Sequence, residues 1–353
     1  MTRFHPKDLK EGMVLARSIV GEDGRILLKG GIRLRCSYIE RLRRLDIPAV
    51  YILDPGEKYV PSEIVPERVR AHAVQQVKEA FEAVAIGRPF CVHAIEETVD
   101  RLLDEILATR SPILGLEEIR AQDAYTYRHS VNVCVISLLL GITLGLSMGQ
   151  LRELGVGALL HDIGKVHVPP EILRKTGPLS QEETDLMRRH TKWGYDHLRA
   201  YPDLSILSAR VAWQHHERLD GSGYPLGVRA DRIHLYSRLV MVADVYDAMT
   251  SERPYRAGLD PLDVLRHLQR LSGQLFASDV VDALAQVVSP YPRGARVLLN
   301  TGEVAKVIEV NPALLERPRV RILETSRPDR LSVPFEIDLQ RDISRSICKV
   351  IRE

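Results

Sequence analysis

The spacing of apolar residues divides the chain into stretches of different texture. Residues 1–65 contain three short apolar runs, MVLARSIV, RILLKGG and AVYIL. A segment of helical pattern, SYIERLRRLD, precedes the third run. Runs of this kind, ending at the Pro and Gly residues of DPGEKYVPSE, predict a small α/β module. From Val69 the apolar residues recur at spacings of three and four, as in an amphipathic helix. We therefore expect a helical connector over residues 66–110.

Helical patterns follow one another through residues 111–290, with breaks at Pro and Gly clusters such as HVPP and LDGSGYP. After Pro290 the texture changes to short β-rich runs separated by turn residues: RVLLN, EVAKVIEV, RVRILET and SVPFEIDL. Such runs predict a small sheet or barrel. We expect a mainly α protein with its main domain over residues 111–290 and a small β-rich domain over residues 291–353.

One stretch is apolar enough to raise the question of a membrane span. Ser130 to Leu151 contains no charged residue and is long enough to cross a bilayer. However, it carries Asn132 and three glycines, and it lacks both aromatic belts and a flanking cluster of cationic residues. We predict a buried core helix here and no membrane span.

The charge balance of the chain limits the classes of partner that we expect it to bind. The 353 residues include 49 Lys and Arg against 47 Asp and Glu, so the net charge of +2 gives no broad reason to expect nucleic acid or membrane as a partner. An anionic ligand must then be held locally. The four cysteines lie far apart without a CxxC pair, and MTRFHPKDLKEGM has no apolar stretch typical of a secretion signal. We expect a reducing, cytoplasmic location.

The candidate chemistry lies in the helical region, where seven of the twelve histidines fall close together: His129, His161, His167, His190, His197, His215 and His216. Asp162 and Asp244 sit in or beside apolar helical runs. An unpaired buried carboxylate is costly, so both need partners. Imidazoles and carboxylates together suit divalent iron, manganese, zinc or nickel.

An aspartate has two oxygens and can bridge two ions, and Asp162 is the candidate for that role. Such a pair of ions can lower the pKa of a bridging water and clamp a phosphoryl oxygen. This pattern indicates phosphodiester hydrolysis. A lone histidine is more often a surface or hydrogen-bonded core residue, and we leave His167 and His197 out of the site.

The set of motifs, taken in order, resembles the HD-GYP subgroup of the HD metal-dependent phosphohydrolase superfamily over roughly residues 115–290. The motifs that carry the resemblance are DAYTYRHSVNV, HDIGK, MRRHTKWG, HHERLDGSGYP and ADVYDAMTSERPYR. The resemblance implies an HD-type helical bundle with a centre of two or three metals. It also implies hydrolysis of cyclic di-GMP to linear pGpG, to GMP or to both, in bacterial second-messenger signalling.

The resemblance further implies two ligand sets that share Asp162. One metal would be held by His129, His161, Asp162 and Asp244, and the other by Asp162, His190, His215 and His216. Lys165 would be catalytic with Asp162, as a cation on the scissile phosphate. Its alternative role is that of a lysine complementing a helix dipole. Trinuclear members have a glutamate where this chain has Tyr125, so we expect two ions, with iron or manganese ahead of zinc or nickel.

The same resemblance implies substrate contacts. Arg253 and Arg256 match positions that contact the phosphate or guanine, and arginine offers a planar fork of donors for either. Gly223 and Tyr224 belong to a loop that would form a wall of the pocket and could contact a GGDEF-domain protein. The residues alone show only a turn there. A homodimer is left open, although the apolar repeat of the connector is too short for a dimeric coiled coil.

Two rival functions remain. Another HD-type enzyme, acting on a mononucleotide or alarmone, would share the metal ligands but lack HHERLDGSGYP and RPYR, and both are present. A catalytically silent sensor of cyclic dinucleotide or of a GGDEF partner would be indicated by degenerate ligands, and all seven ligand positions are filled.

Overall fold

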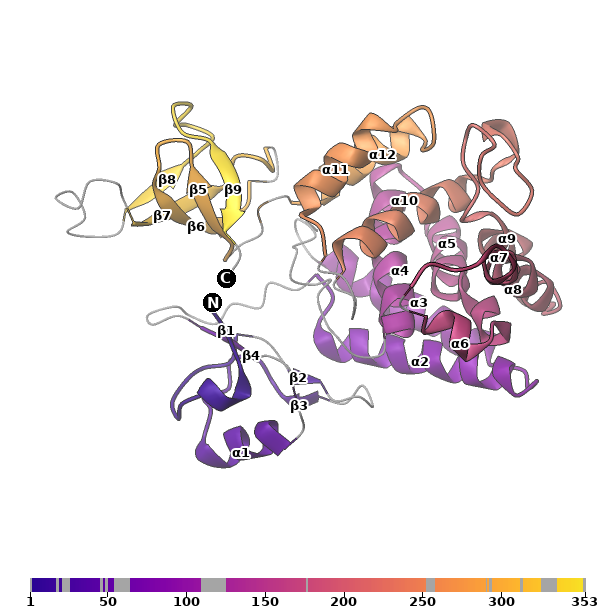
Figure 1. Cartoon of the computed structure of the whole chain (residues 1–353), viewed down its shortest axis with the longest axis horizontal. Coiled ribbons are helices and arrows are strands. Elements are labelled where there is room, and N and C mark those ends of the chain that lie inside the picture. The colour runs from indigo at the N-terminus through magenta and orange to yellow at the C-terminus, as the bar shows by residue number, and fades with distance from the viewer. Residues whose placement is uncertain are drawn as a thin grey trace. The chain divides into compact units, whose positions relative to one another are not determined.

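The computed structural model describes residues 2–16, 19–20, 26–44, 47, 50–53, 64–108, 125–175, 177–251, 258–289, 291, 294–311, 314–324 and 335–351. The chain divides into two units (Figure 1): His72–Pro290, and Met1–Ala71 with Tyr291–Glu353. The first is helical, and the second contains an N-terminal α/β segment and a C-terminal sheet.

The N-terminal segment consists of two small antiparallel pairs and one helix. β1 (Thr2–Phe4) pairs with β4 (Val50–Ile52), β2 (Ile19–Val20) pairs with β3 (Ile26–Leu28), and α1 (Cys36–Arg44) lies between β3 and β4 in the chain. α1 buries Ile39 and Leu42. These side chains share one apolar core with Leu9, Leu15, Leu34 and Val50, so the predicted apolar runs do assemble into an α/β module.

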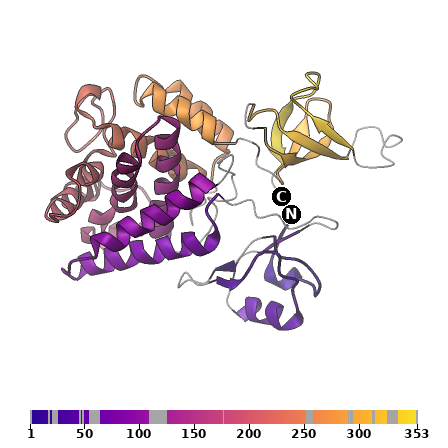
Figure 2. The same cartoon turned by 180° about the vertical axis from the view of Figure 1, so that it is seen from behind.

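The C-terminal segment, drawn in yellow in Figure 2, is an antiparallel sheet. It has five strands in the order β8-β7-β6-β5-β9. Its strands are β5 (Arg296–Leu299), β6 (Val304–Glu309), β7 (Arg319–Glu324), β8 (Glu336–Asp338) and β9 (Ile347–Ile351). The alternating side chains Val297, Val320 and Ile322 are buried. The first four strands match predicted runs. β9 was not predicted, because this edge strand is largely exposed and carries little apolar alternation.

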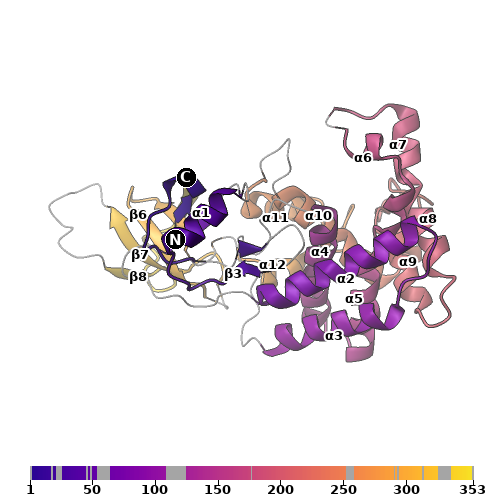
Figure 3. The same cartoon turned by 90° about the horizontal axis from the view of Figure 1, so that it is seen from below.

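The helical unit is built from eleven described α-helices. They are α2 (Glu67–Ala85), α3 (Val92–Ala108), α4 (Tyr125–Thr143), α5 (Met148–Leu160), α6 (Pro170–Leu173), α7 (Gln181–Arg188), α8 (His190–Leu198), α9 (Ile206–Gln214), α10 (Leu235–Thr250), α11 (Pro261–Arg270) and α12 (Ser278–Val287). α4 packs on α5 and α10, and α9 packs on α5, α8 and α10. α3 packs on α5, as the view from below shows (Figure 3).

The uncharged stretch from Ser130 to Leu151 forms two helices, so the prediction of one core helix was wrong. α4 ends at Thr143, and Gly145 takes a positive φ of 75°, a backbone conformation that glycine adopts without strain. Ser147 then caps α5 in a capping box with Gln150. Hydropathy detects neither the turn at Gly145 nor the helix cap at Ser147. Among the described residues, no helix combines the length and apolar character needed to cross a membrane.

Candidate metal centre

A close approach between two backbone segments brings the HDIGK motif to α8. α5 ends at His161, and the chain turns through Asp162 into the short 3-10 helix η3 (Ile163–His167). A Cβ atom at Gly164 would lie 2.0 Å from the carbonyl oxygen of His190. Glycine at this position is therefore what lets Asp162 and His190, which begins α8, come together.

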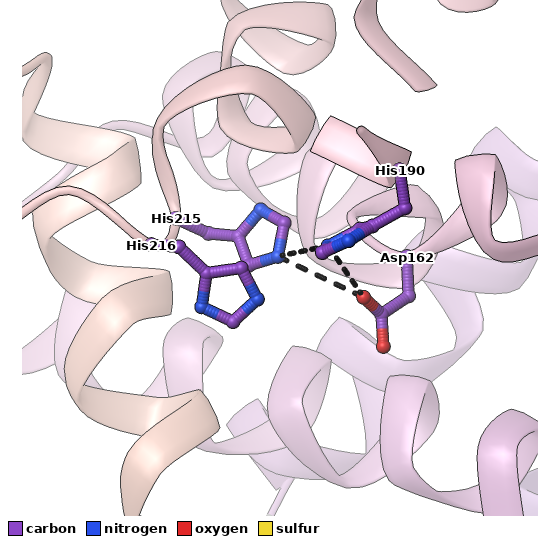
Figure 4. Close-up of side chains that lie close together, drawn as sticks. All are labelled: Asp162, His190, His215 and His216. Atoms are coloured by element: carbon purple, nitrogen blue, oxygen red, sulfur yellow. Dashed lines mark hydrogen bonds and ion pairs between the residues drawn. The ribbon is translucent and has the colours of Figure 1, made fainter. Parts of the chain in front are cut away.

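The first group of ligand atoms consists of Asp162, His190, His215 and His216, drawn in Figure 4. The Nε2 atoms of His190 and His215 lie 3.5 and 3.7 Å from Oδ1 of Asp162 and 3.3 Å from each other. His215 and His216 follow directly after α9. Three helix ends thus present imidazole and carboxylate groups to one point.

The second group consists of His129 on α4, His161 and Asp244 on α10. Nε2 of His129 lies 3.0 Å from Oδ1 of Asp244 and 4.0 Å from Oδ2 of Asp162. Nε2 of His161 lies 3.4 Å from the same Oδ2 atom. Asp162 therefore directs one oxygen at each group.

Backbone carbonyls fix the tautomers of three rings. Nδ1 of His161 lies 2.8 Å from the oxygen of Ala158, and Nδ1 of His190 lies 2.7 Å from the oxygen of Met187. Nδ1 of His215 makes the same kind of contact with the end of α9, at 3.0 Å from the oxygen of Ala212. A carbonyl only accepts, so each Nδ1 donates and each Nε2 keeps its lone pair for the centre.

The protonation states of most of these groups match those of metal ligands. Burial lowers the pKa of His190 to about 3 and also lowers the pKa of His215 and His216, so these rings are neutral. Burial acts to raise the pKa of Asp162, but Lys165 and His161 hold it well below its usual range. Neutral imidazole and ionised carboxylate are the forms that bind divalent ions.

His129 is the exception. Burial acts to lower its pKa, yet the hydrogen bonds from its ring to Asp244 and Asp247 outweigh burial and raise the pKa to about 10. The ring is therefore protonated between two carboxylates when no ion is bound. A metal ion that takes Nε2 must displace that proton.

Two buried atoms support the fit of this centre to metal. Nε2 of His161 and Oδ1 of Asp162 have no hydrogen-bond partner among the described residues. Leaving a buried polar atom unsatisfied costs about 1 to 3 kcal/mol. Two divalent ions, one at each ligand group, would give each of these atoms a partner and remove that cost. With the mixed nitrogen and oxygen donors around them, these atoms form a site suited to divalent metal.

Asp247 is a residue that the motif analysis missed. Its carboxylate is fully buried, and Oδ2 lies 2.6 Å from Nδ1 of His129. Oδ1 accepts hydrogen bonds from Asn132 at 3.0 Å and Ser251 at 3.3 Å. The available signal was an acidic residue three positions after Asp244 in the same apolar run, which places both on one helix face.

The glycine-rich loop folds back onto the histidine doublet. A Cβ atom at Gly223 would lie 2.4 Å from the backbone of Glu217, so glycine is needed for this close approach. The Tyr224 ring stacks on the His216 ring at 4.7 Å and 28°. Glu217, also missed from sequence, is fully buried and accepts hydrogen bonds from the backbone amides of Leu226 and Val228. The loop therefore supports a candidate ligand and is more than a simple turn.

The remaining sequence candidates are placed unequally. Nζ of Lys165 lies 2.5 Å from Oδ2 of Asp162, at the edge of the centre. Arg253 and Arg256 lie in residues 252–257, outside the described residues, as does the side chain of Tyr125. His167 and His197 belong to neither ligand group: His167 lies against Trp193, and His197 contacts Tyr201.

Comparison with known proteins agrees with this geometry. The HD domain family model matches residues 101–280, and a model described as a KOW domain associated with HD domain matches residues 296–353. A cyclic di-GMP phosphodiesterase of Pseudomonas aeruginosa is 37% identical over 275 residues, which cover 78% of this chain and 65% of that protein. This chain thus spans just under two thirds of that relative.

Two further relatives differ in their named substrates. The cyclic di-GMP phosphodiesterase response regulator of Xanthomonas campestris is 32% identical over 267 residues, which cover 70% of each chain. The 3'3'-cGAMP-specific phosphodiesterase 1 of Vibrio cholerae is 37% identical over 180 residues, which cover 46% of this chain and 42% of that protein. The relatives thus share phosphodiester hydrolysis and differ in the cyclic dinucleotide that they are named for.

Proposed function

This chain belongs to the HD-domain family, in its HD-GYP subgroup, and we propose that it is a metal-dependent phosphodiesterase that hydrolyses cyclic di-GMP to linear pGpG, to GMP or to both. The observation that carries the proposal is the carboxylate of Asp162. Its Oδ1 faces His190 and His215, and its Oδ2 faces His129 and His161. One side chain thereby serves two ligand groups.

We propose that the centre holds two divalent ions, one in each group, with Asp162 shared between them. Two such ions would supply an activated water and would offset the charge of a phosphodiester. Iron or manganese is our first assignment and zinc or nickel the alternative, since the nitrogen and oxygen donors suit all four. The absence of a third ion stays a prediction from Tyr125.

Lys165 is proposed to act on the scissile phosphate. Its side chain is about one quarter exposed, and its ammonium group contacts the carboxylate of Asp162 that both ligand groups share. A cation there can neutralise the charge that develops on the phosphoryl oxygens. The roles of Arg253 and Arg256 on phosphate or guanine, and of Gly223 and Tyr224 as a pocket wall, stay predictions from the resemblance.

The experiment is a product time course with anaerobically purified protein, comparing cyclic di-GMP with 3'3'-cGAMP. We expect faster conversion of cyclic di-GMP. Preferential cleavage of 3'3'-cGAMP would reassign the substrate within the same chemistry. Lack of any product from protein that carries its metals would favour the silent sensor. A GGDEF-domain partner at the loop, a homodimer and a cytoplasmic location also stay predictions.

A further inference from the structure

Arg188 lies beside the metal centre without belonging to either ligand group. It is the last residue of α7, two positions before His190. Its guanidinium carbon lies 5.1 Å from the centre of the Tyr224 ring. The His216 ring, stacked at 4.7 Å, covers one face of Tyr224. The Tyr224 ring therefore contacts both a candidate metal ligand and a cation.

Arg188 is more accessible to a ligand than His216. Its side chain is 50% exposed, whereas that of His216 is 20% exposed. A guanidinium that lies flat on an aromatic ring keeps its N–H groups along its edge, where they can donate to an anion.

The donors of Arg188 are largely unused by the described part of the chain. Its one ion pair among the described residues is a distant contact of 3.9 Å with Asp185. Arg218, the other arginine near the loop, donates to the carbonyl oxygen of Glu217 at 2.7 Å and packs on Phe276. Arg188 is therefore the better placed of the two to bind a ligand.

We propose that Arg188 binds the second, non-scissile phosphate of the cyclic dinucleotide, an inference that rests on the proposed function. A cyclic dinucleotide carries two phosphates, and the metal centre with Lys165 can serve one of them. The other needs its own cation near the centre. The planar fork of an arginine matches two phosphate oxygens, and the Tyr224 ring holds that fork in place.

The test compares Arg188→Ala with Arg189→Ala, a matched control because Arg189 is the next residue, equally charged and also exposed. For Arg188→Ala we expect KM for cyclic di-GMP to rise about tenfold to a hundredfold, as for loss of a hydrogen bond to a charged group. Arg188→Lys should lie between it and the parent, since it keeps the charge and loses the fork. Arg189→Ala should stay within about twofold, the scale of an ordinary surface change.

A purely structural role would produce a different pattern. If Arg188 only held Tyr224 against His216, its removal would lower kcat and the metal content per chain, with KM changed little. We expect the reverse: kcat and metal content close to those of the parent, and a raised KM. The structural pattern would overturn the proposal.

Two inhibitors separate phosphate from guanine, whose edge also offers paired acceptors. Cyclic di-AMP has two phosphates and no guanine, whereas linear GpG has two guanines and one phosphate. Arg188→Ala should raise the inhibition constant of cyclic di-AMP about as much as KM, and that of GpG several-fold less. The opposite pattern would assign Arg188 to guanine and refute phosphate binding.

Failure of the inference is distinguishable from failure of the proposed function. If the parent hydrolyses cyclic di-GMP and Arg188→Ala has the same KM as Arg189→Ala, the proposed role of Arg188 is wrong and the proposed function stands. If the parent carries its metals and hydrolyses no cyclic dinucleotide, the function is wrong, and the role of Arg188 falls with it.

Discussion

The fully buried Asp247 offers a sharp test of how the centre is organised, because it touches a candidate ligand and does not itself join either ligand group. Its Oδ2 lies 2.6 Å from Nδ1 of His129. Asp247→Asn keeps the size of the side chain but replaces the charged acceptor with a neutral amide. The His129 ring would then lose the anion that orients it and makes it more basic.

The size of the effect follows from the contact. A hydrogen bond to a charged group contributes about 1.5 to 3 kcal/mol. Loss of the group that is hydrogen-bonded to a metal-binding histidine lowers metal affinity about 10- to 100-fold. These two ranges agree, since each tenfold change corresponds to about 1.4 kcal/mol. The contact is short and Asp247 is fully buried, so we expect metal affinity to fall near the upper end of this range, about 30- to 100-fold.

The assay is chelator competition under anaerobic conditions, with circular dichroism to verify that the variant is folded. Ser251→Ala is the matched control, because it removes a 3.3 Å contact to the other oxygen of Asp247 and leaves His129 untouched. We expect it to change metal affinity by less than about threefold, as for a weak neutral hydrogen bond. A folded Asp247→Asn variant with the affinity of the parent would refute the positioning role of this carboxylate.

Three further predictions follow from the same contacts. Asp162→Ala should lose both metal and hydrolysis, because two cations would face each other without the shared carboxylate; elemental analysis showing normal metal content would exclude the bridge. Lys165→Ala should retain its metals and turn over more slowly, and loss of metal would show that its role is to hold Asp162. Because the metal-free His129 has a pKa of about 10 and must lose its proton on binding, metal affinity should rise up to about tenfold from pH 7 to pH 8. A pH-independent affinity would contradict that protonation state.

The sequence predicted which residues form the two groups better than it predicted their arrangement. The seven ligand candidates stand in recognisable motifs, and the structure places all of them in two groups. The two oxygens of Asp162 face different ligand groups because of the way α4, α5, α8 and α10 pack together. No local sequence pattern predicts this packing. Asp247 was missed for the same reason, since its partner His129 lies 118 positions away.

The fold shows the same division. Periodicity predicted most helices and four strands, because one buried face leaves a regular apolar pattern. It failed where local backbone chemistry decides the structure, at Gly145 and Ser147, which separate α4 from α5. It also failed at β9, an edge strand that pairs with β5 but buries little. Hydrogen bonding to a neighbouring strand leaves almost no trace in composition.

The most direct test of the central claim is one measurement on anaerobically purified protein: metal content per chain together with the nucleotide products formed from cyclic di-GMP over time. We expect about two divalent ions per chain, as two ligand groups would hold, and conversion of cyclic di-GMP to pGpG, to GMP or to both. A chelator should stop the conversion, and restoring the metal should restart it. Protein that carries two ions per chain and leaves cyclic di-GMP intact would contradict the account.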